Sequence, residues 1–189
     1  MTKFETALKK YLAIFESQEM YFVNDLKNLE LFKKTPGNKS AEDIRTKISA
    51  VNDKEISDLG LMESMVSHIL NLNIDDRLQK NDLTVVEAIA TLTIGDKVHH
   101  VLHFASVYCN LHKPDSYPIY SDQYLEFYRK YIADNKLQLD PNKLNTYDVF
   151  TKAQDNLSIR LGLKGKMNYL HLRKFAWLYA EHVVKEAAA

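Results

Sequence analysis

The chain has 189 residues, of which 46% are hydrophobic and 11% aromatic, so it can bury the core of one domain or of two small lobes. The chain has 25 basic residues (lysine and arginine) and 25 acidic residues (aspartate and glutamate). This balance excludes the overall basic charge of proteins that bind nucleic acids without sequence specificity. Cys109 is the single cysteine, which excludes an internal disulfide framework and agrees with a reducing cytoplasm.

The N-terminal segment predicts an amphipathic helix. Thr2 and Glu5 form a capping box, apolar residues follow at helical spacing, and the segment "TPGN" at 35–38 ends the helix. This start lacks the pattern of a signal peptide, and no stretch approaches the ~18 consecutive apolar residues of a membrane span. We therefore expect a cytoplasmic protein that does not enter a membrane.

The next segments also have the helical period. Ser40 is expected to cap a second helix, and Gly60 is expected to interrupt the helical stretch that follows it. Thr84 and Glu87 form another capping box, which opens a short apolar helix.

A glycine-centred turn, "TIGDK", follows this short helix. Asp96 is expected to cap a helix over residues 97–112, which the prolines of the segment 112–124 terminate. The amides near Gly95 and Asp96 would then lie at a helix start, where they can bind a phosphate. The positive end of the helix dipole would favour the neutral, nucleophilic amine of Lys97. An ordinary exposed lysine between two helices is the alternative.

The rest of the chain predicts further helices. Aromatic residues from Tyr124 to Tyr131 recur at helical spacing and are expected to form a core face. Gly162 and Gly165 separate the last two helices, and Trp177 of the C-terminal helix is expected to pack into the core. No segment alternates convincingly between apolar and polar residues, so no strand is predicted. The sequence therefore predicts an all-α fold of about eight helices.

Candidate metal and thiol sites are weak. His99 and His103 stand four residues apart on a predicted helix and could share a metal, but no third ligand follows at a useful spacing, so we expect no metal site. Cys109 and His112 are one turn apart, but the apolar neighbours of the cysteine favour a buried, inert thiol. None of the glycines forms a nucleotide-binding pattern, so no cofactor is expected.

One stretch resembles a known family. The segment "FASVYCNLHKPDSYPIYSD" at 104–122, preceded by "IGDKV" at 94–98, resembles the helix-hairpin-helix DNA glycosylase superfamily, in particular its small branch similar to 8-oxoguanine DNA glycosylases. The resemblance covers about the last two thirds of the chain and leaves the N-terminal third unassigned. It implies two helical lobes flanking a cleft, here placed at residues 1–93 and 94–189.

The resemblance also implies site residues. The turn between the two helices, at residues 94–98, would bind a DNA phosphate, and Lys97 would attack the sugar. The aspartate that assists loss of the base would fall at Ser121. This sequence has its carboxylate one position later, at Asp122. A shift of one residue turns a helical side chain by about 100°. A role for either residue as a helix cap explains both without chemistry. Tyr117 and Tyr120 are the candidates for a base pocket.

Two functions therefore remain open. The first is a DNA-glycosylase-like protein that binds damaged DNA or a nucleobase, with base-excision or abasic-site lyase activity. The alternative is a catalytically inactive helical interaction module that keeps the fold and binds a protein partner. The neutral overall charge and the displaced aspartate favour this alternative.

Overall fold

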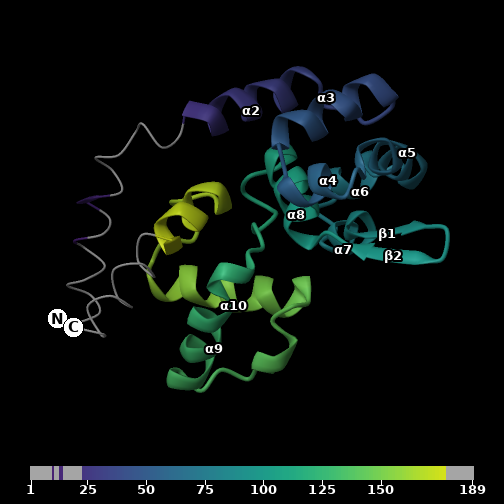
Figure 1. The fold of residues 1–189 in the computed structure, drawn as a ribbon. Helices are drawn as coiled ribbons and strands as arrows, with labels where there is room; N and C mark the ends of the chain where they lie inside the picture. Colours follow the sequence, from purple (N-terminus) through teal and green to yellow (C-terminus); the bar gives the residue numbers. More distant parts are fainter. Residues whose placement is uncertain (1–9, 11–12, 15–22, 178–189) are drawn as a thin grey trace. The chain divides into compact units, whose positions relative to one another are not determined.

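The computed structural model of the protein describes residues 10, 13, 14 and 23–177. Helices make up most of these residues, which confirms the predicted all-α class (Figure 1). The capping box predicted at the N-terminus lies outside the described residues. Within the described part of the chain, no helix combines the length and the apolar content needed to cross a membrane.

The chain divides into two compact units. We call residues 24–120 the N-terminal unit. The described residues up to Val23 are grouped with residues 121–177, and we call this second group the C-terminal unit. The boundary predicted between residues 93 and 94 lies inside the N-terminal unit.

The N-terminal unit contains seven helices and two short strands among the residues that the structure describes. In chain order these are α2 (Val23–Lys34), α3 (Ala41–Val51), α4 (Lys54–Asp58), α5 (Met62–Leu72), α6 (Asp75–Gln79), α7 (Thr84–Ala90), β1 (Thr91–Ile94), β2 (Lys97–His100) and α8 (Leu102–His112). Helix α3 packs against α5 and α8, and α7 packs against α8. The core between them includes Phe32, Ile44, Ile48, Met65, Ile69, Val86, Ile89, Phe104 and Tyr108.

Local sequence explains several helix boundaries. Ser40 caps α3 as predicted, because its hydroxyl accepts the backbone N–H of Asp43 at 3.0 Å. Gly60 lies between α4 and α5 with a φ of +64°, a conformation that glycine adopts without strain. The capping box predicted at Thr84 and Glu87 is wrong, because Thr84 is already the first helical residue of α7.

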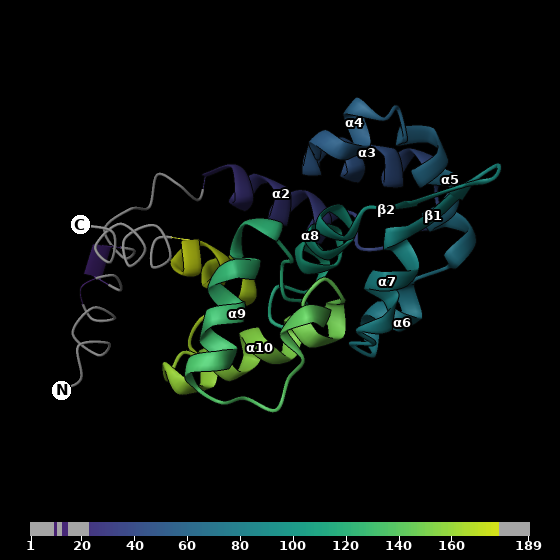
Figure 2. The same ribbon diagram turned by 60° about the horizontal axis from the view of Figure 1, so that its bottom comes forward.

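The helix predicted over residues 97–112 is also wrong in its first part. Residues 91–100 form an antiparallel hairpin in which Thr91 pairs with His100 and Ile94 pairs with Lys97. Gly95 is the first residue of the two-residue turn and has a φ of +58°, as in a type II′ hairpin. The hairpin projects beyond the helices of its unit (Figures 1 and 2).

The C-terminal unit is also helical. Its elements are η2 (Asp122–Tyr124), α9 (Leu125–Asp134), η3 (Pro141–Lys143), α10 (Tyr147–Arg160) and a helical segment at residues 169–177. Gly162 and Gly165 separate the last two helices as predicted, both with positive φ. The buried side chains include Tyr128, Tyr147, Phe150, Leu157, Leu172 and Phe175.

The aromatic predictions for this unit are confirmed in part. Tyr124, Tyr128 and Tyr131 are all buried, so this stripe does form a core face. Trp177, by contrast, is 37% exposed, so the prediction that it fills the core is wrong. Phe175, two residues earlier, fills the core instead, with an exposure of 1%.

Candidate functional site

The predicted phosphate site lies at the tip of the β-hairpin. Lys97 is the first residue of β2 and faces Ile94 across a turn made by Gly95 and Asp96, and all four residues are exposed. Because α8 begins only at Leu102, the amides of this turn do not start a helix. The dipole argument for a neutral lysine therefore does not apply here.

The candidate carboxylate lies in the C-terminal unit. Asp122 is exposed and is the first residue of η2, and α9 begins only at Leu125. Ser121 occupies the position before η2, but its side chain makes no capping hydrogen bond, which corrects the cap predicted there. Lys97 and Asp122 fall in different compact units, so a catalytic site shared by them stays a prediction.

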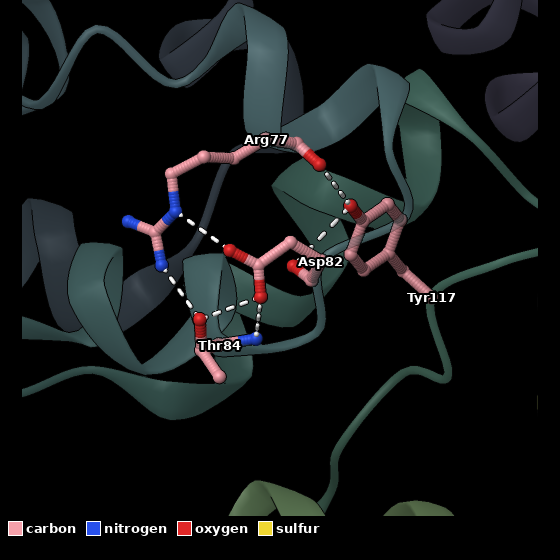
Figure 3. Close-up of polar contacts among 4 residues, drawn as sticks. All are labelled: Arg77, Asp82, Thr84 and Tyr117. Atoms are coloured by element: carbon pink, nitrogen blue, oxygen red, sulfur yellow. Dashed lines mark hydrogen bonds and ion pairs between the residues drawn. The ribbon is translucent and has the colours of Figure 1, made fainter.

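Tyr117 belongs to a polar cluster at the junction of α6 and α7 (Figure 3). Its buried hydroxyl lies 3.5 Å from the backbone oxygens of Arg77 and Asp82. The Asp82 carboxylate accepts the hydroxyl of Thr84 at 2.6 Å, the backbone N–H of Thr84 at 2.9 Å and the Nε–H of Arg77 at 2.9 Å. These hydrogen bonds lower the pKa of Asp82 to about 2, and the bond from the Thr84 hydroxyl has the largest effect.

Tyr120 is likewise packed in the interior. Its backbone N–H donates to the Ser106 hydroxyl at 2.9 Å, and Asn110 Nδ2 donates to the backbone oxygen of Tyr117 at 2.7 Å. Tyr117 and Tyr120 are 0% and 5% exposed. A base could reach these two tyrosines only by displacing packed side chains, because Ser106 and Asn110 of α8 hold the segment that carries them.

The two histidine candidates lie on different elements, and the cysteine candidate is buried. His99 lies on β2, whereas His103 lies on α8, where its Nδ1 is 2.8 Å from Asp53 Oδ2. Among the described residues, no three histidine, cysteine, aspartate or glutamate side chains form a metal-binding group. Cys109 is fully buried, and burial raises the pKa of its thiol, in agreement with the predicted inert cysteine.

A buried polar network around Asn38 connects the loop after α2 with α3, α6 and α8. Lys47 Nζ donates to Asn38 Oδ1 at 3.1 Å, and the Tyr108 hydroxyl donates to the same oxygen at 2.6 Å. Asn38 Nδ2 donates to Asp75 Oδ1 at 2.7 Å and lies 3.3 Å from His112 Nε2. The backbone N–H of Asn38 also donates to the Asp75 carboxylate, at 3.1 Å. The asparagine is thus the centre of the network.

Burial sets the charges of this network. Desolvation lowers the pKa of Lys47 to about 8, although the carboxylates of Asp75 and Asp43 oppose the change. Desolvation lowers the pKa of His112 to about 3, and the charge of Lys47 adds to this effect. At pH 7 the lysine is therefore mostly charged and the imidazole is neutral.

The network forms part of the wall of a pocket of about 870 Å³. Asp75 and His112 line it, together with the buried apolar side chains of Phe32, Leu78 and Leu111. A pocket of this volume is large enough for a small molecule, and its walls mix polar and apolar side chains. This pocket lies entirely within the N-terminal unit.

Sequence reasoning missed this site. Lys47 follows Ile44 by three residues and precedes Ile48, so helical spacing did place it on the buried face of α3. By its sequence, Asn38 is only the last residue of the segment "TPGN" that ends the first predicted helix. The approach of Asp75 and His112 to Asn38 depends on tertiary packing between helices far apart in the sequence, which gives no local signal.

Comparisons with known proteins place the N-terminal unit in a family. The family model HI_0787_N, described as an N-terminal domain, matches residues 7–116, more than half of the chain. An uncharacterized protein of Haemophilus influenzae is 31% identical over 86 residues, which make up 45% of this chain and 42% of that relative. The match thus spans less than half of the relative's length. No solved structure matches the chain. From the match to its family model, the chain belongs to the HI_0787_N family.

Proposed function

We propose that the protein is a helical binding module without base-excision chemistry. The observation that carries this proposal is the exposed β-hairpin at residues 91–100, which stands where the resemblance to glycosylases requires a helix start. A hairpin tip lacks the converging amides and the dipole of a helix N-terminus, which are the features that bind a phosphate.

The surroundings of Lys97 support the same proposal. A lysine becomes a nucleophile near pH 7 when an apolar pocket or a second cation disfavours its charged form. Lys97 is exposed, and its neighbour Val98 is 65% exposed, so water rather than an apolar wall surrounds this amine. The tip therefore offers no enclosed site for a sugar.

The glycosylase-like function rests on the resemblance of residues 104–122 and on an accessible amine at Lys97. It makes a distinct chemical prediction. The amine would add to C1′ of an abasic site and lose water to form an imine, which borohydride would reduce to a stable protein–DNA adduct.

Borohydride trapping tests the proposal. The full chain is incubated with duplexes that carry an abasic site or 8-oxoguanine, with a known bifunctional glycosylase as the assay control. We expect neither an adduct nor released base. An adduct that disappears in Lys97→Ala but persists in Lys80→Ala, an exposed lysine after α6, would refute the proposal.

DNA affinity gives a second measurement. A protein that holds several phosphates loses affinity steeply as salt rises, because it releases counterions from the DNA. We expect DNA binding to be undetectable or insensitive to salt. A steep salt dependence that weakens in Lys97→Ala would support the glycosylase-like function instead.

A further inference from the structure

The hydrogen bonds of Asn38 fix the tautomer of His112. A charged lysine only donates and a carboxylate only accepts, so Asn38 must turn its oxygen to Lys47 and its nitrogen to Asp75. The second hydrogen of that nitrogen then points to His112 Nε2, 3.3 Å away. A neutral imidazole that accepts at Nε2 carries its hydrogen on Nδ1.

This hydrogen has no acceptor within the described part of the protein. His112 is only partly buried and lines the pocket, and its Nε2 is already used by the network. The Nδ1–H group is therefore a donor that the network orients and leaves available to a ligand. The rings of Phe32 and Tyr108, at centroid distances of 4.9 and 5.3 Å, hold the imidazole in place.

The charges around the pocket favour an anion. The charged residues that line it are Lys33, Lys39, Lys113, Asp75 and Asp76. Behind the lining, the buried ammonium of Lys47 interacts with the carboxylates of Asp75 and Asp43. The lining itself has three lysines and two aspartates, an excess of one positive charge, which favours a ligand with a negative group.

The pocket also offers some apolar surface to a hydrocarbon body. Leu29, Pro36 and Pro114 line it and are half-buried or exposed, whereas Phe32, Leu78 and Leu111 are at most 4% exposed and present little surface. Burying such a body against these side chains supplies affinity, while one or two polar groups fix its orientation.

From these observations we propose that the pocket binds a small carboxylate with an apolar body, for which benzoate is the probe. The apolar body packs against Leu29, Pro36 and Pro114, and the carboxylate accepts the Nδ1–H of His112. This inference names the ligand class of the binding module proposed above and rests on that function.

Titrations with three matched compounds test the ligand class. Benzoate, uncharged benzamide and cationic benzylamine are added to the ¹⁵N-labelled full chain, and amide shifts are followed by NMR. We expect saturable shifts at pocket residues and an affinity for benzoate about tenfold above that for benzamide, since charge-assisted hydrogen bonds are the stronger ones. Equal affinity for benzamide or benzylamine, or no saturable shift with benzoate, would overturn the proposal.

Single substitutions test the assigned groups. Lys39→Ala should weaken benzoate binding about threefold through loss of a nearby charge, whereas Lys80→Ala, at an exposed lysine outside the pocket, should not change it. His112→Phe keeps a ring but removes the donor, so it should weaken binding about tenfold. Unchanged affinity in both Lys39→Ala and a folded His112→Phe protein would contradict the assignment.

The tautomer can be measured without any substitution. The ¹⁵N shifts of His112 in the wild-type protein should report the Nδ1–H form, and the Nε2–H form would overturn the proposal. These results are independent of trapping at Lys97, which does not line the pocket. An adduct there would refute only the absence of excision chemistry, and failed benzoate binding would refute only the ligand class.

Discussion

Lys47 brings a charge into the interior of the N-terminal unit. Its side chain is 0% exposed, and its Nζ donates to the backbone oxygen of Gly37 at 2.7 Å and to Asn38. The same nitrogen lies 5.6 Å from the centre of the Phe32 ring, within cation–π range. These contacts satisfy a group whose burial would otherwise be costly.

The stability of the protein should therefore depend on Lys47 in alkaline solution. Desolvation lowers its pKa from 10.5 to about 8, so between these values the unfolded chain holds a proton that the folded chain releases. The free energy of unfolding then rises with pH across this window. Between pH 8 and pH 10, the free energy of unfolding of the wild type should rise by about 2 kcal/mol relative to that of Lys47→Met. Urea denaturation at several pH values measures this difference, and a difference that stays constant with pH would be inconsistent with the buried amine.

Helix boundaries show where local patterns suffice. Ser40 caps α3 as its sequence predicts, because its hydroxyl and the backbone N–H of Asp43 that donates to it lie within one turn. At α7 the carboxylates of Asp82 and Glu87 could each accept the backbone N–H of Thr84. This N–H donates to Asp82, so the predicted capping box does not form. Glu87, assigned to that box, instead lies 2.9 Å from His100 of the hairpin. A sequence pattern cannot rank such competing partners.

The role of Asp82 at the start of α7 can be tested by substitution. Asp82→Ala should lower the free energy of unfolding by about 1 kcal/mol, because it removes the acceptor for the first turn. Asp58→Ala, at the exposed end of α4, should change the free energy of unfolding by only about a few tenths of a kcal/mol. The pKa of Asp82 is lowered to about 2, so its contribution is complete above pH ~4 and is lost as pH falls towards 2. Equal stability of the two variants at pH 7 would contradict this role.

At the scale of the whole molecule, helical periodicity predicted the class and most helices, since those depend on spacing along one segment. The hairpin escaped prediction because only Leu92 of its strands is buried, so it lacks the alternation that reveals a half-buried strand. The pocket escaped it because residues from α2, α6 and α8 meet only after folding. The outward position of Trp177 likewise depends on how its helix packs.

The central claim is that residues 91–100 form an exposed hairpin and not the start of a helix. NMR chemical shifts and cross-strand NOEs of the full chain measure this most directly. We predict strand-like shifts on both sides of Gly95, NOEs from Leu92 to His99 and from Thr93 to Val98, and helical shifts only from Leu102 onward. Continuous helical shifts from Lys97 to His112, without those NOEs, would contradict the claim and restore the phosphate-binding helix start.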